Sequence, residues 1–386
     1  MKRILSIAAA VLLAAAILVS CEPGPAGLFA LLEEEEPLDK GTAAFNANTA
    51  AFVTRAGTYY YAAVGATLLR RPTAGGAWEM VTVPGAPAGS NITAGVSDGT
   101  NLFISYAPAV DTILRFNGTI WGPYGTIPSG EPVQSLLRAN GQLFAVTQSS
   151  TGTSSSDYTT YYSIYFYNGG PWAETPIDGS TIASGLPSSI AWDGSNYWIA
   201  AGNRIFKGAT PAGLGSDAQA ATAGFSSTNP VLSLFYDNDI TSNDAVLAAA
   251  TGKLWKLNTG GVYVASGTFG SSERRLSSVI VVPKNGGGNA TVVGVKSWAS
   301  DKYSGYYEYN ASQNSLANFG SGVVPSSAYD MVSDNSNYVT TLDDLSIEGF
   351  YYDDTLGEET IFARTVMGGL WSNTWDGVSW SGWDRE

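Results

Sequence analysis

The side chains that could do chemistry in this chain are restricted in type. Its 386 residues contain no histidine and a single cysteine, Cys21. Without histidine, the chain cannot use Ser-His-Asp or Cys-His catalysis, and it cannot bind zinc, copper or haem through imidazole. Carboxylates, tyrosines, arginines and hard cations remain. Carboxylate chemistry stays open, because a glycosidase needs only two carboxyl groups about 5 to 9.5 Å apart.

Oxygen-bearing side chains near position 240 alternate as in a calcium loop. An EF-hand needs glycine at its sixth position and glutamate at its twelfth. Counted from Asp237, those positions hold Ser242 and Ala248, which excludes an EF-hand. Two alternatives remain: a looser Ca²⁺ site on Asp237, Asp239 and Asp244, or an ordinary turn rich in Asx residues. No other cofactor is expected.

A recurring β-hairpin is the element that must position these groups. Residues 113–127, ILRFNGTIWGPYGTI, combine an apolar run, an Asn-Gly turn, a tryptophan and a second short run. Related segments start at Leu68, Ile164, Arg204, Lys253, Tyr306 and Gly369. Seven copies at intervals of roughly 40 to 60 residues indicate a repeat protein and favour a β-propeller.

A second hairpin with a polar turn recurs at the same period. Its turns centre on Gly57, Gly99, Gly141, Gly194, Asn243, Gly288 and Asn335. Glycine and asparagine suit these turns because they tolerate a positive φ. Two hairpins per repeat give four antiparallel strands, A to D, in about 45 residues, which is one propeller blade. Separate β-sandwich domains would need about 100 residues each.

The sequence therefore predicts an all-β fold, a β-propeller of seven four-stranded blades. Six or eight blades are the alternatives, because the last repeat is overlong. Blades are expected to begin near Thr49, Ser90, Pro132, Leu186, Pro230, Leu276 and Ser327.

The first twenty residues have the pattern of a leader. Lys2 and Arg3 precede an apolar run, which ends in Leu18-Val19-Ser20-Cys21. This order resembles the lipobox of bacterial lipoprotein signal peptides, and the resemblance implies that Cys21 is lipidated and becomes the mature N-terminus. A transmembrane anchor and an ordinary cleaved signal are the alternatives, although a span needs about 20 apolar residues.

The expected organisation is a signal peptide (1–20), a lipid-anchored acidic and proline-rich tether (21–48) and the propeller (49–386). The expected location is the bacterial cell envelope, with the lipid on Cys21 holding the protein to the outer membrane or the cell surface. A lone cysteine allows no internal disulfide, so the core alone must stabilise the fold. The net charge of −14 argues against a nucleic-acid partner.

Single blades resemble known propeller families. Residues 374–380, TWDGVSW, look like the Asp-box of sialidase-type propellers, one residue short. Residues 168–172, NGGPW, resemble kelch repeats, and residues 252–260, GKLWKLNTG, are similar to quinoprotein-like propellers, a group that includes outer-membrane assembly lipoproteins. Each resemblance covers one blade or less and supports the fold rather than an activity. A sialidase would also need an arginine triad, and the arginines show no recurrence at one blade position.

Tryptophans recur at one place in their blades, at Trp78, Trp121, Trp172 and Trp380. They are either sugar-stacking platforms or wedges between adjacent blades, each burying up to ~150–250 Å². Their periodic recurrence favours wedges.

Three B–C connections are enlarged, at residues 148–163, 296–305 and 343–359. The B–C and D–A connections of a propeller share one face, and long loops on a rigid scaffold usually carry binding residues. The aromatic and acidic residues predicted to bind a ligand there are Tyr158, Tyr161, Trp298, Tyr303, Tyr351, Tyr352, Asp353 and Asp354. Such a surface suits a polysaccharide, a cationic peptide or an envelope protein; the alternative is a solvated surface that binds no ligand. The sequence thus favours a ligand-binding or protein-interaction scaffold, with a carboxylate-based, sialidase-like glycoside hydrolase as the alternative.

Overall fold

The structure, a computed structural model, separates the chain into two compact units, Met1–Ala43 and Ala44–Glu386. It describes residues 45, 49–86, 88–107, 112–151, 159–177, 186–217, 225, 230–237, 245–250, 253–257, 263–268, 274–283, 289–297, 305–309, 342, 345–355, 359–366 and 368–386. All of these belong to the second unit, so the leader, Cys21 and most of the tether lie outside the described residues.

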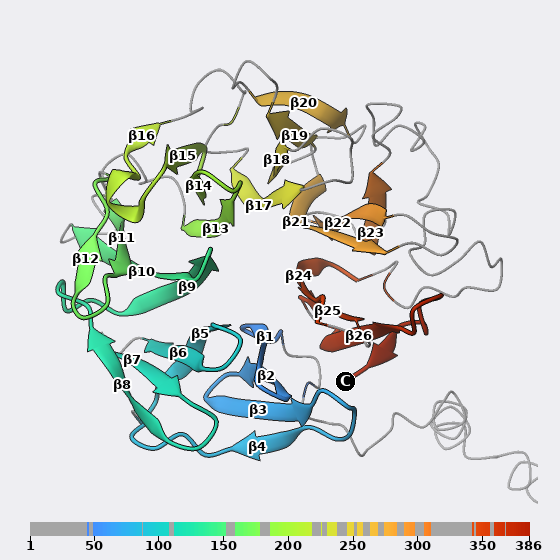
Figure 1. The fold of residues 1–386 in the computed structure, drawn as a ribbon, viewed down its shortest axis with the longest axis horizontal. Coiled ribbons are helices and arrows are strands. Elements are labelled where there is room, and N and C mark those ends of the chain that lie inside the picture. The colour runs from blue at the N-terminus through green and yellow to red at the C-terminus, as the bar shows by residue number, and fades with distance from the viewer. Residues whose placement is uncertain are drawn as a thin grey trace, which may run out of the picture. The chain divides into compact units, whose positions relative to one another are not determined.

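The second unit is a seven-bladed β-propeller, which confirms the predicted fold (Figure 1). Blades 1 to 3 are β1 (Val53–Ala56), β2 (Tyr59–Val64), β3 (Thr67–Pro72), β4 (Glu79–Val81); β5 (Asn91–Ser97), β6 (Leu102–Ala107), β7 (Thr112–Phe116), β8 (Trp121–Thr126); and β9 (Val133–Ala139), β10 (Gln142–Thr151), β11 (Thr159–Tyr167), β12 (Trp172–Glu174). Blades 4 and 5 are β13 (Pro187–Trp192), β14 (Tyr197–Ala201), β15 (Arg204–Gly208), β16 (Ser216–Asp217); and β17 (Val231–Asp237), β18 (Ala245–Ala250), β19 (Lys253–Leu257), β20 (Tyr263–Thr268). Blades 6 and 7 are β21 (Arg274–Pro283), β22 (Asn289–Ser297), β23 (Gly305–Tyr309); and β24 (Ile347–Asp353), β25 (Glu359–Thr365), β26 (Leu370–Trp375), β27 (Asp384–Arg385).

Each sheet runs outward in chain order, so the first strand of every blade lies innermost (Figure 1). The first six blades begin within a few residues of their predicted starts. The predicted start of the last blade is wrong, because its innermost strand β24 begins at Ile347 and not near Ser327. The polar segment around Asn335 has the composition of a turn, but the turn that joins strands A and B of this blade follows Asp353.

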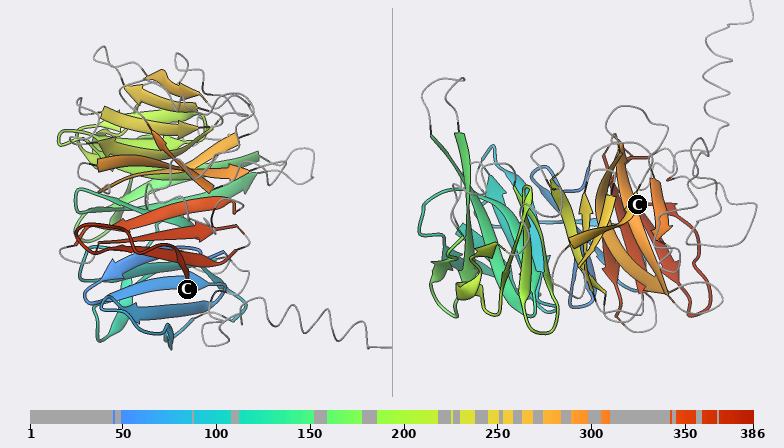
Figure 2. Two further views of the ribbon diagram at one scale, coloured as in Figure 1. Left: turned by 90° about the vertical axis from the view of Figure 1, so that its right-hand side faces the viewer. Right: turned by 90° about the horizontal axis from the view of Figure 1, so that it is seen from above.

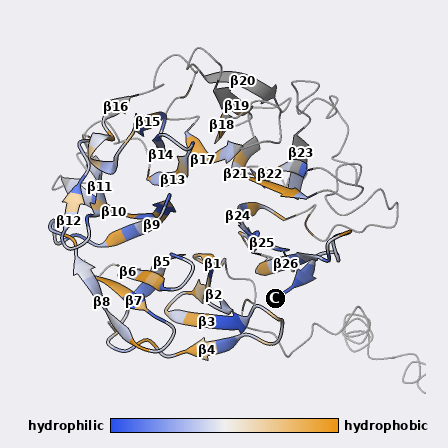
Figure 3. Ribbon diagram, viewed as in Figure 1, coloured by the Kyte–Doolittle hydropathy of each residue, from blue (hydrophilic) through white to orange (hydrophobic). Residues whose placement is uncertain are grey.

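The core consists of seven apolar clusters, one at each seam between neighbouring blades. Strand β14 shows why its whole sequence, YWIAA, is apolar. Tyr197, Ile199 and Ala201 pack toward blade 3, whereas Trp198 and Ala200 pack toward blade 5. Side chains alternate across a strand, so a strand buried on both faces must be apolar at every position. Figure 3 shows hydrophobic stretches in several blades around the ring.

The recurrent tryptophans lie at these seams, which confirms the wedge prediction. Trp172 and Trp380 are only 3% and 4% exposed. The indole N–H of Trp380, in blade 7, donates to the carbonyl of Pro283 in blade 6, with 2.9 Å between donor and acceptor. Trp78 and Trp121 are half-buried at the seams on either side of blade 1.

Hydroxyl groups also tie neighbouring innermost strands together. In six blades the pairing of strand A with strand B skips one residue near the start of strand A. Next to these skips, Ser189 Oγ accepts the N–H of Leu234 at 3.0 Å and Ser278 Oγ accepts the N–H of Phe350 at 3.2 Å. Each bond joins one blade to the next. The innermost strands therefore form a hydrogen-bonded wall around the central channel.

The enlarged B–C connection of blade 3 is an extended hairpin rather than a loop. Strands β10 and β11 stay paired out to Thr151 and Thr159, and the ribbon projects beyond the neighbouring blades (Figure 2). In the part of the chain that the structure describes, no helix is long and apolar enough to cross a bilayer.

Candidate functional site at one mouth of the channel

Two cavities lie against the innermost strands. The larger, of about 750 Å³, is lined by residues of β9, β13, β17, β21 and β24, by Asn289 at the start of β22 and by Asp354 after β24. The smaller, of about 450 Å³, lies beside the A–B turns of blades 1, 2 and 3 and the end of β24. Four residues line both cavities: Arg138, Tyr351, Tyr352 and Asp354. The two cavities therefore meet, and we call them together the channel-mouth site.

Three of the residues predicted to bind a ligand reach this site from a strand and not from a loop. Tyr351, Tyr352 and Asp353 end β24, and Asp354 follows directly. Their predicted position in a B–C connection is wrong. The run of aromatic residues in IEGFYYD has the composition of a strand, and it forms the innermost strand of the last blade. These residues therefore lie at the A–B end of the channel, opposite to the predicted face.

Asp353 is a structural residue rather than an exposed charge at the rim of a binding loop. Its carboxylate is 4% exposed and forms an ion pair with Arg55 at 3.1 Å. It also accepts hydrogen bonds from the hydroxyls of Tyr60 at 2.9 Å and Thr355 at 2.6 Å. The contacts with Arg55 and Tyr60 fasten the last blade to the first. The carboxylate is thereby neutralised and has little capacity left for a ligand.

Both tyrosines of the site are held neutral. Tyr351 accepts the backbone N–H of Arg55 at 3.0 Å, and burial, with a contribution from the charge of Asp353, raises the pKa of its phenol to about 12. Tyr352 donates to Glu359, and burial together with that carboxylate raises its pKa further above the ordinary value. Some sialidases use a tyrosine nucleophile. Raised pKa values instead suit these two phenols to hydrogen bonding and ring contacts.

The site does not hold a pair of facing carboxylates among the residues described. Its described acidic residues are Asp353 and Asp354, which are neighbours in the chain. Asp353 is buried in the seam, whereas Asp354 is exposed. In glycoside hydrolysis two carboxyl groups must face the scissile bond from two sides. Asp353 and Asp354 do not form such a pair, because only Asp354 is exposed to a ligand.

The predicted calcium loop falls mostly outside the described residues. Asp237 ends β17, and Asp239 and Asp244 are not described. No group of three or more acidic side chains placed to hold a metal occurs in the part of the chain that is described.

Of the remaining predicted ligand residues, the structure describes only Tyr161, which does not line either cavity. Tyr161 lies half-buried on the projecting hairpin, opposite Ser149 on β10. This hairpin leaves the propeller at its B–C face, away from the channel mouth. Tyr158, Trp298 and Tyr303 lie outside the described residues.

Sequence reasoning missed the two arginines of the site, Arg55 and Arg138. Both lie near the end of an innermost strand, and each is followed by alanine and then the A–B turn, at Gly57 in blade 1 and at Asn140-Gly141 in blade 3. This shared position corrects the view that the arginines do not recur at one blade position. The short pattern Arg-Ala before a turn was the available signal.

Other acidic residues close turns and are not available as site groups. The carboxylate of Asp98 accepts the N–H groups of Thr100 and Asn101 at 2.9 and 2.6 Å, and Asp376 does the same with Val378 and Ser379 at 2.8 and 2.7 Å. In Asp376, the N–H groups of Ser379 and Val378 hold the pKa below its ordinary value. The Asp-box-like segment 374–380 thus contains the turn that joins strands C and D of the last blade.

No protein-family model matches this chain, and no curated protein matches it. Solved structures resemble it in fold. The extracellular domain of the putative one-component system BT4673 from B. thetaiotaomicron superposes with a TM-score of 0.56 at 15% identity, over 84% of this chain and 38% of that one. A chain of the Mitotic Checkpoint Complex gives 0.54 at 9% identity, over 87% and 92%, and YCF48 bound to D1 peptide gives 0.50 at 10%, over 84% and 91%. At these identities the similarity shows the propeller fold alone.

Proposed function

We propose that this chain is an exported, lipid-anchored β-propeller of the bacterial cell envelope that binds a ligand at the channel-mouth site. The observation that carries the proposal is the meeting of two cavities at the same four side chains, Arg138, Tyr351, Tyr352 and Asp354. Sites for small ligands are typically clefts of about 300–1,000 Å³ with a few placed polar groups. Both cavities have volumes in that range.

The chemistry of the lining favours binding over hydrolysis. The two phenols are neutral, and the carboxylate of Asp353 is occupied by its ion pair with Arg55 in the seam between the last and first blades. What remains is a hydrogen-bonding surface with aromatic rings and two exposed charges. Such a surface suits an oligosaccharide or a peptide segment of an envelope protein.

Two features support a location in the cell envelope. Leu18-Val19-Ser20-Cys21 has the pattern of a lipobox, and the strongly negative charge suits an exported surface that does not contact nucleic acid. BT4673, one of the proteins of similar fold, is described as having an extracellular domain.

The anchor is tested by Cys21→Ser in the full-length protein. Growth with a labelled fatty acid should label the unaltered protein and leave the variant unlabelled. Detergent phase separation should move the variant to the aqueous phase. A variant that still carries the label and stays in the detergent phase would contradict the lipid anchor on Cys21.

The binding site is tested by filling it. Asn289 is exposed and lines the larger cavity, so Asn289→Trp should block a ligand there. Thr119→Trp adds the same side chain at an exposed turn of blade 2 that lines neither cavity. The detergent-solubilised full-length protein is titrated with oligosaccharides and peptides released from cell envelopes. Only Asn289→Trp should lose binding, and equal binding by both variants would move the site elsewhere.

A further inference from the structure

Opposite charges line the channel-mouth site from opposite walls. Arg138 lies on β9 of blade 3, and Asp354 follows β24 of blade 7. Strands β9 and β24 face each other across the central opening (Figure 1). Both side chains are exposed, and both line the larger and the smaller cavity.

Among the described residues neither charge forms an ion pair, whereas four other basic residues do. Among the described residues the ion pairs are Arg55–Asp353, Arg70–Glu79, Arg71–Glu386 and Lys296–Glu348. Arg138 and Asp354 form no ion pair with each other or with another described side chain. Arg138 acts electrostatically on Asp98, but the carboxylate of Asp98 already accepts the N–H groups of its own turn.

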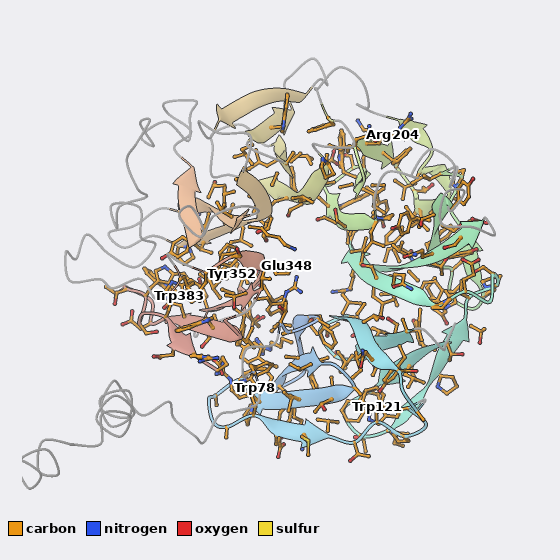
Figure 4. The ribbon with its side chains drawn as sticks, turned by 180° about the vertical axis from the view of Figure 1, so that it is seen from behind. Trp78, Trp121, Arg204, Glu348, Tyr352 and Trp383 are labelled. Atoms are coloured by element: carbon orange, nitrogen blue, oxygen red, sulfur yellow. The ribbon has the colours of Figure 1, made fainter. Side chains whose placement is uncertain are left out.

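The second arginine of the site, Arg55, does not add an unpaired positive charge to it. Arg55 lines the smaller cavity, but Asp353 neutralises it at 3.1 Å. On the other wall, Tyr352 donates to Glu359, and Asp354 adds its negative charge nearby. Figure 4 shows Tyr352 on the last blade, on the side of the channel. One wall of the site is thus cationic and the facing wall is anionic.

We infer that the site binds a zwitterion, namely a free α-amino acid or a short peptide with both termini free. The guanidinium of Arg138 matches a carboxylate, which it can bind through two parallel N–H donors. The carboxylate of Asp354 accepts the N–H donors of an ammonium group. Tyr351 and Tyr352 line both cavities as well, and their rings provide contact area for a side chain. This inference rests on the proposed function and names the class of its ligand.

The inference is tested by pairing charge-removing variants with ligands that lack the matching charge. Full-length protein in detergent is titrated calorimetrically with a dipeptide, its N-acetylated form, its C-amidated form, a single amino acid and an uncharged disaccharide. The variants are Arg138→Gln and Asp354→Asn. Arg115→Gln and Asp384→Asn are the controls, because both residues are exposed and line neither cavity.

Arg138→Gln should weaken binding of the free dipeptide about 10-fold or more, as expected for the loss of a charge-assisted hydrogen bond. The same variant should bind the C-amidated dipeptide as weakly as the unaltered protein does. Asp354→Asn should show the matching pattern with the N-acetylated dipeptide, and both controls should bind normally. A comparison of the amino acid with the dipeptide decides which of the two is the better ligand.

Three results would overturn the inference: no binding of either zwitterion at millimolar concentration, equal binding of the blocked and free dipeptides, or binding unchanged by both variants. Failure of the proposed function is a separate result. If the disaccharide binds and Asn289→Trp abolishes that binding, the channel-mouth site still binds ligands and only the zwitterionic class is wrong.

Discussion

The seam between blades 7 and 1 differs in chemistry from the seam between blades 5 and 6. In the seam between blades 5 and 6, the buried residues that the structure describes are all aliphatic, with the partly buried Phe235 packed against them: Leu247, Ala249, Leu254, Leu276, Val279, Val293 and Val295. The first has aromatic residues in its core, including Tyr60 and Phe362. It also carries the Arg55–Asp353 and Arg71–Glu386 ion pairs, and Arg364 donates to the carbonyls of Ala50 and Ala51 at 3.2 and 2.8 Å.

The difference follows from which parts of the chain each seam joins. Blades 5 and 6 are consecutive, so their connection already holds them near each other. Arg55 and Asp353 are 298 positions apart, and the entropy cost of closing a loop grows with its length. Apolar burial is non-directional, whereas hydrogen bonds require defined geometry. The polar contacts thus set how the last blade docks on the first.

The largest expected effect comes from removing the aromatic centre of the closing seam. Phe362 is fully buried, with its ring centroid 4.8 Å from that of Tyr60 and 6.4 Å from that of Trp78. Phe362→Ala should lower the free energy of unfolding by about 3–5 kcal/mol, measured in urea. Hydrogen exchange should show blades 1 and 7 opening first. Leu247→Ala, in the aliphatic seam, is the matched variant and should open blades 5 and 6 instead.

Asp353→Ala should have the next largest effect. It leaves Nη1 of Arg55 and the hydroxyl of Tyr60 without their acceptor, and breaking a buried ion pair costs about 3–5 kcal/mol. Because Arg55 is 24% exposed, we expect about 3 kcal/mol, near the lower end of that range. The control is the adjacent, exposed Asp354→Ala, which should change stability by no more than about 0.5 kcal/mol. Equal effects of the two variants would mean that the polar contacts do not hold the seam.

Lowering the pH should reduce the free energy of unfolding by a smaller amount. The group responsible lies in a turn of blade 4 that belongs to neither of the two seams. Burial opposes ionisation of the Asp193 carboxyl in blade 4. The indole N–H of Trp198 and the N–H groups of Asn196 and Ser195 outweigh burial and hold its pKa below the ordinary value. A lowered folded-state pKa stabilises the fold above the unfolded pKa of about 3.9, and this stability is lost as pH falls through the folded value.

Asp193→Asn keeps an acceptor oxygen for the turn but removes the titration. The unaltered protein should therefore lose more stability than the variant between pH 7 and pH 3, measured by urea unfolding. Identical losses would show that this turn does not contribute to the acid sensitivity.

The hairpins that the sequence shows most clearly are local, and they were predicted well. Turns at Gly57, Gly99 and Gly194 use positive φ angles of 60°, 93° and 89°, which glycine adopts without strain. Periodic tryptophans were correctly assigned to the seams. The last blade was misplaced because the polar segment near Asn335 has the composition of a turn, and composition does not reveal which strand pairs with which.

The candidate site shows the same limit. Tyr351, Tyr352 and Asp354 were selected because aromatic residues and acids stood close together in the chain, and all three do line the cavities. Asp353 has the same composition signal and a different role, because its partners Arg55 and Tyr60 come from the first blade. Arg138 was not selected, because the Arg-Ala pair before a turn, which it shares with Arg55, is a short pattern that does not show which side chains line a cavity.

The sequence by itself determined the all-β class, and it favoured seven blades over six or eight and tryptophan wedges over sugar-stacking platforms. These features depend on turn chemistry and on the period of apolar residues, and both operate over a few neighbouring positions. Only the tertiary structure decided which face of the propeller carries the cavities, which aspartate is buried and which charges face each other across the channel. Those properties arise when the ring closes, because closure brings together side chains from blades 1, 3 and 7 whose positions in the chain are unrelated.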